Sequence, residues 1–337
     1  MRIGIIGPGS IATAHKEAID RSGCAELVAI TGGNSEGLER RSAEWGVPIA
    51  ASVVDLVRDH RPDAVWVLSP TPMHYEQLRY LLSVGVPALV DKPPTLTLLE
   101  ALKIRADLDR TGGFIMPGHN RVYDPAVQRA RSIIGAGDLG RVVSANFTVV
   151  GRPPVELMEG WRKRLRNPGG GALADSGYHL VYLSLYLLGV PASVFGAQAT
   201  MFWELESEDT ATALLCYEGG LSATLLQTWA TVDQAMTPVV TIWGTEGTLT
   251  LNGHGLSLDG HGLSLNGTDV AVDRADDSFT EMVRVFASAM RAGLRPVHSF
   301  DDAVTTMAVC DAFYRSCKTG RREAVEHGPA PTAPPQR

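Results

Sequence analysis

The sequence predicts an α/β protein in which an N-terminal parallel sheet is followed by a C-terminal α+β domain with an open, mostly antiparallel sheet. In residues 1–121, short apolar runs alternate with segments of helical periodicity, which indicates a parallel sheet with helical crossovers. In residues 122–327, apolar runs mostly follow one another without long helices between them, which is typical of antiparallel strands. A chain of 337 residues is long enough for two domains, each with its own core.

The first domain is expected to alternate between buried strands and helices. The apolar runs predict strands at residues 3–6, 26–30, 64–68, 88–90 and 114–116. Helices are predicted between them at residues 12–21, 36–44, 74–83 and 98–109. A further helix is expected to start after Asp124-Pro125 and run to Ile134.

The second domain is expected to contain strands at residues 142–150, 194–203, 210–217, 222–230 and 239–243, with helices at 173–188, 279–292 and 301–319. A seven-residue duplication, 253–259 and 260–266, predicts two short edge strands, because two copies are too few for a solenoid. Its His254 and His261 could pair as metal ligands, but a surface position is favoured and no metal is expected. The proline-rich end, 328–337, is expected to be disordered.

The composition argues against several classes of protein. A content of 45% hydrophobic and 20% charged residues is that of a globular protein, and a net charge of −7 argues against nucleic acid as a partner. No apolar run reaches 18 residues, and the apolar N-terminus is too short for a signal peptide, so a cytoplasmic protein is expected. The four cysteines lack metal-type spacing, and reduced thiols are expected; they are Cys24, Cys216, Cys310 and Cys317.

A glycine turn follows the first predicted strand and opens the first helix. The segment Gly7-Pro8-Gly9-Ser10-Ile11-Ala12 has the Gly-x-Gly-x-x-Gly/Ala pattern in the strand–turn–helix context of a Rossmann domain. Gly7 allows the tight turn, Gly9 lets a pyrophosphate approach the backbone, and Ala12 lets helix and strand pack closely. The amides of Ser10 and Ile11 would face the phosphate. The turn predicts a dinucleotide cofactor.

The end of the second strand indicates which dinucleotide. An Asp or Glu there normally bonds the adenosine ribose, but this chain has Thr31-Gly32-Gly33-Asn34-Ser35 and no acid. Small residues leave room for a 2′-phosphate, which Arg40 or Arg41 could reach from the next helix, unless both belong to a solvated helix face. NADP(H) is therefore favoured, with NAD(H) as the alternative.

Lys92 is the first catalytic candidate. It follows the strand that ends near Val90, in Asp91-Lys92-Pro93-Pro94, and ligands of open α/β sheets bind at the carboxyl ends of strands. Two prolines restrict the backbone around it, which is a poor fit to an ordinary surface charge. Lys92 could stabilise alkoxide character or polarise a ketone.

The run Gly169-Gly170-Gly171 leads into a helix that carries Asp175 and His179, four residues apart. Imidazole suits the transfer of a proton that accompanies hydride transfer, and Asp175 could orient the histidine or bind a hydroxyl. Separately, Asp175 could merely favour the helix start and His179 could be structural. As a pair at a glycine-rich helix entry, they indicate chemistry.

Other polar and aromatic residues could line a cleft for a polyhydroxylated ligand. Near the domain junction these are Asn120, Arg121 and Tyr123, and before the glycine run they are Trp161 and Arg162. Trp229 could form a stacking wall, although a core position is favoured for both Trp161 and Trp229.

Together these motifs resemble the Gfo/Idh/MocA family of dehydrogenases over nearly the whole chain. The resemblance includes the Gly7 turn, Asp91-Lys92-Pro93 in place of a Glu-Lys-Pro signature, and Asp175-x-Gly177-x-His179. It also includes the segments 69–74, 118–121 and 244–249. The order and spacing of the motifs make it specific.

The resemblance implies a nicotinamide cofactor, a sugar or cyclitol substrate, and a homodimer or homotetramer formed through the open sheet. It implies that Lys92, Asp175 and His179 are catalytic. It also implies a set of residues along the cofactor, namely Ser69, Pro70, Thr71, His74 and Asp91, and Arg162 as a cofactor or substrate contact. Lys92, Asn120 and Trp161 are expected to contact the cofactor as well. Tyr182 stands where many members have an aspartate, so a phenol is expected to meet the substrate instead of a carboxylate.

Three functions are compatible with these motifs. The first is an NADP(H)-dependent sugar or cyclitol oxidoreductase. The second is a family member that uses transient oxidation to cleave a glycosidic bond and keeps its NAD bound. The third is a cofactor-binding sensor without activity, against which the intact lysine, aspartate and histidine argue.

Overall fold

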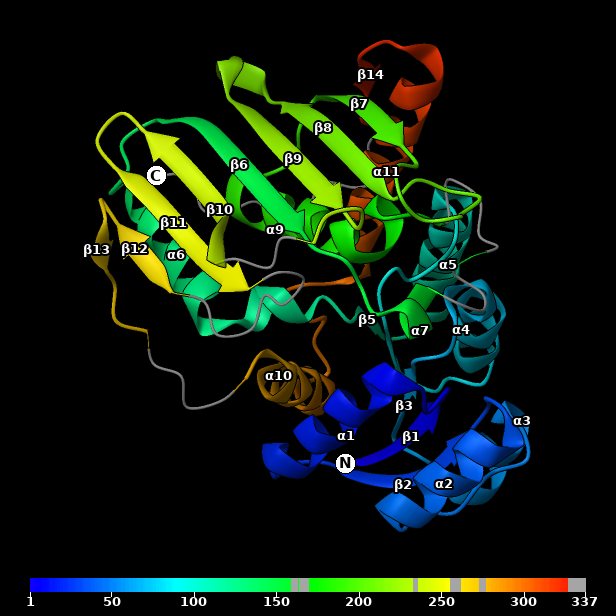
Figure 1. Ribbon diagram of the computed structural model, residues 1–337. Coiled ribbons are helices and arrows are strands. Elements are labelled where there is room, and N and C mark those ends of the chain that lie inside the picture. Colours follow the sequence, from blue (N-terminus) through cyan, green and yellow to red (C-terminus); the bar gives the residue numbers. More distant parts are fainter. Residues whose placement is uncertain (159–162, 164–169, 233–235, 255–261, 273–276, 327–337) are drawn as a thin grey trace. The chain divides into compact units, whose positions relative to one another are not determined.

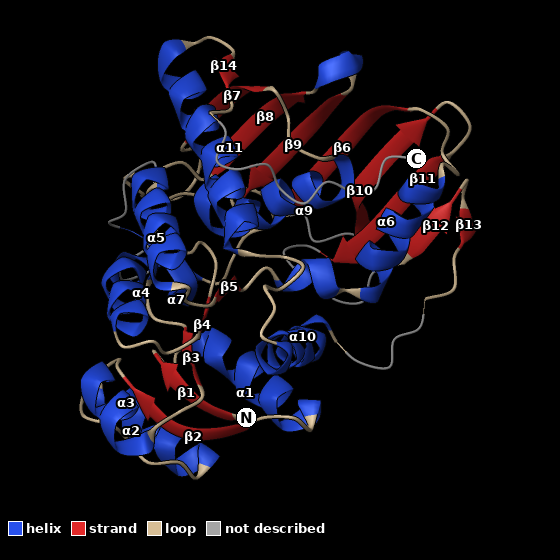
Figure 2. Cartoon of the chain, turned by 180° about the vertical axis from the view of Figure 1, so that it is seen from behind, coloured by secondary structure: helices blue, strands red, loops and turns tan. Residues whose placement is uncertain are grey.

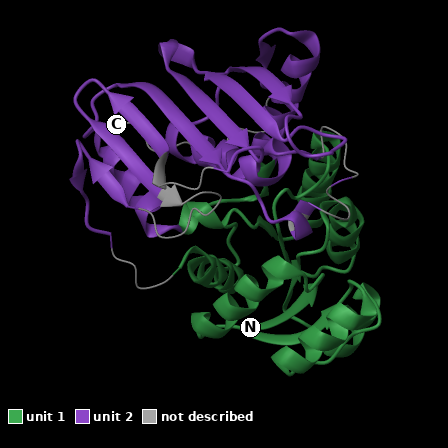
Figure 3. Cartoon of the chain, viewed as in Figure 1, with its two compact units in different colours: residues 1–123, 275–303 green, residues 124–274, 304–337 purple. Residues whose placement is uncertain are grey.

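The computed structural model describes residues 1–158, 163, 170–232, 236–254, 262–272 and 277–326. The chain forms two compact units (Figure 3). Unit 1 comprises residues 1–123 and 275–303, and unit 2 comprises residues 124–274 and 304–337. No helix in the described residues is long and apolar enough to cross a membrane.

Unit 1 is built on a five-stranded parallel sheet, as the alternating pattern predicts. The strand order is β2-β1-β3-β4-β5 (Figure 2). The strands are β1 (Arg2–Ile6), β2 (Glu26–Thr31), β3 (Ala64–Val67), β4 (Ala88–Val90) and β5 (Ile115–Pro117). β3 and β4 are buried along their whole length, as expected for strands covered on both faces. The order reverses between β1 and β3, which is the switch point where such sheets bind ligands.

The helices of unit 1 that follow the strands are α1 (Ser10–Ser22), α2 (Ser35–Trp45), α3 (Val53–His60), α4 (His74–Ser83) and α5 (Leu98–Thr111). Short 3₁₀ turns lie at Thr71–Met73 and Asn120–Tyr123. The sequence pattern does not predict α3, whose two turns bury only Leu56 fully. A segment this short gives too little apolar periodicity to be recognised.

Unit 1 also contains α10 (Ser278–Ala292), although the sequence analysis grouped this helix with the second domain. Phe286 of α10 packs on Trp66 in β3, with ring centroids 4.6 Å apart, and on Phe114 at 5.1 Å. Arg21 at the end of α1 forms an ion pair with Asp277, which caps α10. A helix distant in sequence therefore completes the core around the parallel sheet.

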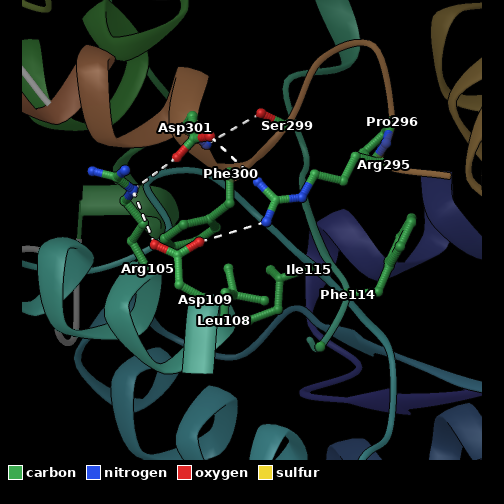
Figure 4. Close-up of a pocket in the computed structure, with 11 residues that line it drawn as sticks. Arg105, Leu108, Asp109, Phe114, Ile115, Arg295, Pro296, Ser299, Phe300 and Asp301 are labelled. Carbon is green, nitrogen blue, oxygen red and sulfur yellow. Dashed lines mark hydrogen bonds and ion pairs between the residues drawn. The ribbon is translucent and has the colours of Figure 1, made fainter. Parts of the chain in front are cut away.

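A ring of four charges fastens the segment after α10 to α5 (Figure 4). Arg105 Nε lies 3.1 Å from Asp301 Oδ1 and 3.8 Å from Asp109 Oδ2. Arg295 lies 3.5 Å from Asp109 Oδ1 and 3.8 Å from Asp301 Oδ2. Each carboxylate contacts both guanidinium groups, so the shallow pocket that these side chains border presents matched charges.

Unit 2 is built on a nine-stranded sheet with the order β13-β12-β11-β10-β6-β9-β8-β7-β14. Neighbours are antiparallel except β6 and β9, which are parallel. The strands are β6 (Val142–Val150), β7 (Ser193–Ala199), β8 (Thr210–Cys216), β9 (Ser222–Thr228), β10 (Met236–Gly244), β11 (Thr248–His254), β12 (Leu263–Leu265), β13 (Thr268–Asp269) and β14 (Glu323–Ala324).

Helices cover one face of this sheet (Figures 1 and 2). They are α6 (Pro125–Ala136), α9 (Tyr178–Leu188) and α11 (Phe300–Thr319). Helix α11 begins in unit 1 and continues into unit 2. The short helix α7 (Val155–Met158) precedes the glycine run, and a 3₁₀ turn lies at Glu218–Gly220. Residues alternate between buried and exposed along β6 and β8, so the other face is open. Large apolar side chains lie on that open face, namely Phe195, Leu214 and Trp243.

Two predicted segments of unit 2 differ from the structure. The strand predicted at 194–203 ends at Ala199, because the Asp209 carboxylate accepts hydrogen bonds from the amides of Met201, Phe202 and Trp203 and folds them into a turn. Of the seven-residue duplication, the second copy forms β12, next to the edge strand β13, while residues 255–261 lie outside the described part. The tail, 328–337, also lies outside it.

Candidate functional site

A cavity of about 660 Å³ opens at the carboxyl ends of β1, β2 and β3 in unit 1. Its walls come from the glycine turn after β1, the segment after β2, and the loop after β3. Of the residues predicted to bind a cofactor, nine line it, namely Gly7, Gly9, Ser10, Gly32, Gly33, Asn34, Arg40, Ser69 and Pro70. The switch point of the sheet therefore carries a cavity of ligand size.

The two glycines of the turn have different reasons to be glycine. Gly7 has φ +82°, and a Cβ there would lie 2.5 Å from Ser69 Cα, so the loops after β1 and β3 can touch only through a bare backbone. A Cβ on Gly9 would have open space around it. Contacts within the described chain therefore do not require glycine at position 9, in contrast to position 7.

The start of α1 is arranged as an anion site. Gly9 N donates to Gly7 O, and Ala12 N donates to Gly9 O, so the amides of Ser10 and Ile11 are those that a phosphate could take. The N-cap residue is Gly9, which has no side chain to cap the helix, and the first turn of α1 contains no acid. Backbone amides and the helix dipole would both favour a phosphate here. The turn thus fits the pyrophosphate of a dinucleotide.

The end of β2 combines two small residues with a helix cap. Thr31 is buried, and its Oγ1 donates to Ala50 O, so its hydroxyl is committed to the core rather than to the cavity. Its carbonyl accepts a hydrogen bond from Gly7 N at 2.8 Å. Asn34 caps α2 by accepting from Gly37 N at 2.7 Å. Gly32 and Gly33 remain as the open wall.

Among the described residues, two arginines line the cavity and no Asp or Glu does. Arg41 is engaged elsewhere, because its Nη1 lies 2.8 Å from Glu44 Oε2 and its guanidinium lies over the Trp45 ring at 5.2 Å. Arg40 is exposed and forms no ion pair with another residue of the described chain. Arg40 is therefore the cation that can turn to an added negative charge.

His74 and Thr71, both expected along the cofactor, are buried supports. His74 Nε2 lies 2.7 Å from Ser69 O, and Nδ1 lies 3.1 Å from Pro93 O, so one ring connects the loop after β3 to the Lys92 loop. Burial lowers the pKa of His74 to about 4, although the Ser69 and Pro93 carbonyls oppose the shift. Ser69 Oγ in turn donates to Gln77, a cavity residue that the sequence analysis missed.

Lys92 follows β4 and is partly buried, with Asp91 before it and a cis peptide bond after it. The end of β5 passes close to this loop, because Gly118 N donates to Val90 O at 2.7 Å and a Cβ on Gly118 would lie 3.2 Å from Asp91 Cα. The structure therefore brings the Asp91-Lys92 loop and the segment after β5 together.

The three candidates after β5 are buried in unit 1. Asn120 Nδ2 donates to Ser278 Oγ of α10 at 3.1 Å, so the sequence-distant helix helps to fix it. Arg121 is 8% exposed, and Tyr123 places its hydroxyl 3.9 Å from Met116 Sδ. Trp161 and Arg162 lie outside the described residues.

In unit 2, Asp175 lies in a π-helical turn, Leu173–Gly177, and His179 lies in the first turn of α9. A continuous α-helix was expected here. The wider turn closes with Gly177 N donating to Ala172 O, five residues back. Asp175 and His179 are partly exposed, whereas Leu173, Ala174, Gly177 and Tyr178 around them are buried. Asp175 and His179, with Ser176 between them, are thus presented from a mostly buried segment.

A buried carboxylate organises the glycine run. Glu208 is 2% exposed, and its Oε1 accepts hydrogen bonds from Leu173 N and from Tyr314 Oη, each at 3.0 Å. A Cβ on Gly171, which has φ +110°, would lie 2.1 Å from Glu208 Oε2. Burial and the nearby Glu208 charge raise the pKa of Tyr314 well above its ordinary value. The backbone of Gly171 therefore wraps closely around Glu208.

Two residues predicted to contact the substrate are buried. Trp229 is 4% exposed and packs with Met158 and Ala172, and its Nε1 donates to Ser176 Oγ at 2.7 Å. Tyr182 is completely buried, with its hydroxyl 2.7 Å from His179 Nδ1. Both side chains support the segment that carries Asp175 and His179.

No cluster of three His, Cys, Asp or Glu side chains suited to a metal ion occurs among the described residues. The sequence pattern gave no signal for Glu208, because a lone Glu before a strand has no motif of its own. Gln77 was missed for a related reason, since its place on the outer part of α4 marks it as an ordinary surface residue.

Comparison with protein-family models gives two matches. Residues 1–119 match the model described as an oxidoreductase family with an NAD-binding Rossmann fold. Residues 127–250 match the GFO/IDH/MocA C-terminal domain.

Individual proteins resemble the chain over nearly its full length. D-Xylose 1-dehydrogenase (NADP(+)) 2 of Haloferax volcanii is 26% identical, with 95% of this chain and 98% of the relative covered. Inositol 2-dehydrogenase of Rhizobium meliloti is 23% identical, with 96% and 99% covered. Among solved structures, the WlbA dehydrogenase of Bordetella pertussis in complex with NADH and UDP-GlcNAcA superposes with a TM-score of 0.84 at 24% identity, with 97% and 99% covered.

Proposed function

The chain belongs to the GFO/IDH/MocA family of NAD(P)-dependent oxidoreductases, and we propose that it transfers a hydride between NADP(H) and a hydroxyl or keto carbon of a sugar, cyclitol or related compound. The observation that carries the proposal is the cavity around the glycine turn, which combines an uncapped helix start, a bare Gly9 and two arginines with no acid. The bound nicotinamide would supply the hydride acceptor or donor.

The substrate class is supported by two relatives that are named for a pentose and an inositol, and by a similar solved structure that contains a sugar nucleotide. These substrates share a secondary alcohol or lactol carbon that can lose a hydride. Two measurements distinguish the alternatives from the proposed function. A glycosidase with retained NAD, purified without added cofactor, would carry bound nicotinamide that does not exchange. A sensor would turn over no substrate.

In the proposed reaction, Lys92 donates a hydrogen bond to the substrate oxygen and stabilises its developing negative charge. His179 takes the proton of the hydroxyl as the hydride leaves carbon, and returns it in the reductive direction. Asp175 binds a neighbouring hydroxyl or orients the histidine. The proton ends on His179, and the two electrons leave with the hydride, so the oxidation is balanced.

The assay follows NADPH and NADH oxidation with a panel of ketosugars, and NADP⁺ and NAD⁺ reduction with sugars and inositols. With the best substrate, Lys92→Ala and His179→Gln are each expected to lower kcat by about 10²–10⁴-fold, as loss of an acid–base or charge-stabilising group does. Lys103→Ala on the exposed side of α5 serves as the control. Full turnover by Lys92→Ala would refute the mechanism.

The preference for NADP(H) is proposed to come from Arg40. A 2′-phosphate bonded by this guanidinium would gain a charge-assisted hydrogen bond, which is worth about 10–100-fold in binding. Arg40→Ala should therefore raise KM for NADPH by about that factor and leave KM for NADH within about twofold. An unchanged NADPH-to-NADH ratio would assign the phosphate to another group. Arg41→Ala tests the alternative arginine and is expected to have the smaller effect, because Arg41 is held by Glu44.

We further propose that the open face of the nine-stranded sheet is covered by a second copy of the chain, as a homodimer or homotetramer. Three large apolar side chains, Phe195, Leu214 and Trp243, are between 39% and 43% exposed on this face. Light scattering on a sizing column should give a molar mass of two or four times the 36.1 kDa of one chain. A monomer that persists at high protein concentration would refute the proposal.

A further inference from the structure

His179 is held by a buried phenol from its own helix. Its Nδ1 lies 2.7 Å from Tyr182 Oη, one turn along α9. The two rings meet edge to face, with centroids 5.4 Å apart and an interplanar angle of 68°. The Tyr182 side chain has no exposed surface, whereas His179 is partly exposed. One partner thus belongs to the core and the other to the surface of the segment.

We propose that Tyr182 is a positioning residue, which fixes the ring of His179 so that Nδ1 faces the core and Nε2 exchanges the proton with the substrate. The chemical part of this inference rests on the proposed function, in which His179 is the base. A neutral imidazole carries one N–H and one lone pair, and the partner of one nitrogen sets the role of the other. With Nδ1 bonded to the phenol, Nε2 is the nitrogen to which the proposed reaction assigns the proton exchange.

The direction of the hydrogen bond follows from the reaction. Nε2 can accept the substrate proton only if it has a lone pair, so the neutral ring carries its hydrogen on Nδ1 and donates it to Tyr182 Oη. When the substrate O–H proton arrives at Nε2, both nitrogens carry hydrogen, and the same bond to Oη persists. The ring therefore need not rotate during the transfer, and no proton passes through Tyr182.

The surroundings of Tyr182 keep its hydroxyl in place. Tyr178 packs edge to face on it, with centroids 6.1 Å apart, and is itself completely buried. The Tyr178 hydroxyl forms a hydrogen bond with Thr306 of α11, so this second phenol is anchored away from His179. A substrate hydroxyl has no access to a side chain enclosed in this way. Tyr182 therefore contributes through His179 and not by direct contact with the substrate.

The two tyrosines provide a matched pair of variants. Tyr182→Phe and Tyr178→Phe each remove one buried hydroxyl from α9 and keep the aromatic ring. Tyr182→Phe is expected to lower kcat by about 10–100-fold, the value of a hydrogen bond to a group that becomes charged, with KM within about twofold. The primary isotope effect with deuterated NADPH should rise, because proton and hydride transfer become slower. Tyr178→Phe is expected to lose a similar amount of thermal stability and to keep kcat and the isotope effect.

A spectroscopic measurement tests the positioning without any substrate. In protein labelled with ¹⁵N-histidine, at alkaline pH where imidazole is neutral, the His179 signals are identified by their loss in His179→Gln. The expected result is a hydrogen on Nδ1 in the wild type and in Tyr178→Phe, and a mixture of tautomers in Tyr182→Phe. A hydrogen on Nε2 in the wild type, or a tautomer that does not respond to Tyr182→Phe, would overturn the inference.

The two measurements separate this inference from the proposed function. If no sugar or cyclitol is turned over but the tautomer depends on Tyr182, the positioning stands and the assigned reaction fails. If the enzyme is active and Tyr182→Phe changes neither kcat nor the tautomer, the reaction stands and the role of Tyr182 fails.

Discussion

His15 is a buried histidine that should make the stability of unit 1 depend on pH. It lies on α1 with no exposed surface, and within the described chain neither ring nitrogen has a hydrogen-bond partner. Its ring meets Phe279 of α10 edge to face, with centroids 5.1 Å apart. Burial in these apolar surroundings lowers the pKa of His15 from 6.5 to about 3. The folded protein therefore holds the ring neutral at every pH in ordinary use.

The sign of the effect follows from where the proton binds. Below about pH 6.5 the unfolded chain binds a proton at His15 that the folded chain does not, so the free energy of unfolding falls as pH falls, down to about pH 3. With these two pKa values the loss is negligible at about pH 7.5 and about 2 kcal/mol at about pH 5. His74, whose pKa is lowered to about 4, adds a loss over a similar window that His15 variants leave unchanged.

The test is urea unfolding of the wild type and His15→Leu at a series of pH values, followed by tryptophan fluorescence. Leucine keeps most of the volume and removes the unpaired ring, so the variant should be at least as stable as the wild type near neutral pH. It should gain about 2 kcal/mol on the wild type by about pH 5. His15→Ala should show the same pH dependence as His15→Leu but be less stable at every pH, because a cavity costs about 2–5 kcal/mol. Parallel wild-type and His15→Leu curves would refute the reasoning.

Two further predictions concern the glycine turn and the carboxylate under the second glycine run. Gly7→Ala should destabilise the protein by more than about 2 kcal/mol in thermal melts, because a methyl group has no room against Ser69. Gly9→Ala should instead melt like the wild type, and calorimetry should show that it binds NADPH at least tenfold more weakly. Equal melting of the two variants would contradict the distinction. Glu208→Gln should lower the free energy of unfolding by about 2 kcal/mol, because the amide replaces a carboxylate that accepts hydrogen bonds from both Leu173 N and Tyr314 Oη. A melting temperature within experimental error of the wild type would show that the carboxylate is not needed.

The parallel sheet and its phosphate turn could be predicted because their signals are local. The buried runs of β1 and β3 are continuous in sequence, and the glycine pattern lies directly between a strand and a helix. The placement of α10 in unit 1 could not be predicted in this way. It depends on contacts such as Phe286 against Trp66, which are 220 residues apart in the chain.

The helix entry in unit 2 shows a second limit of the sequence. A glycine run followed by apolar periodicity predicts a helix at 173–188, and a helix is present. The π-turn at its start depends on Glu208, which lies 35 residues beyond Leu173 and holds its amide. Hydrogen bonds of this kind have no periodic trace, so the presence of the helix was predictable and its first turn was not.

The same argument applies to residues that were assigned by motif. A motif places a residue type at a position but does not say which way its side chain points. His74, Trp229 and Tyr182 were all expected to meet a ligand, and all three are buried with their polar atoms on other protein groups. Burying a polar group is favourable only when it is bonded, so each of these atoms fixes its partner: the Ser69 loop, the Ser176 hydroxyl and the His179 ring. Lys92, Asp175 and His179, to which the proposed chemistry is assigned, are among the polar side chains left partly exposed in these same segments, together with Asp91 and Ser176. Burial thus divides the motif residues into those that hold the site and those that are available to a substrate, and only the structure supplies that division.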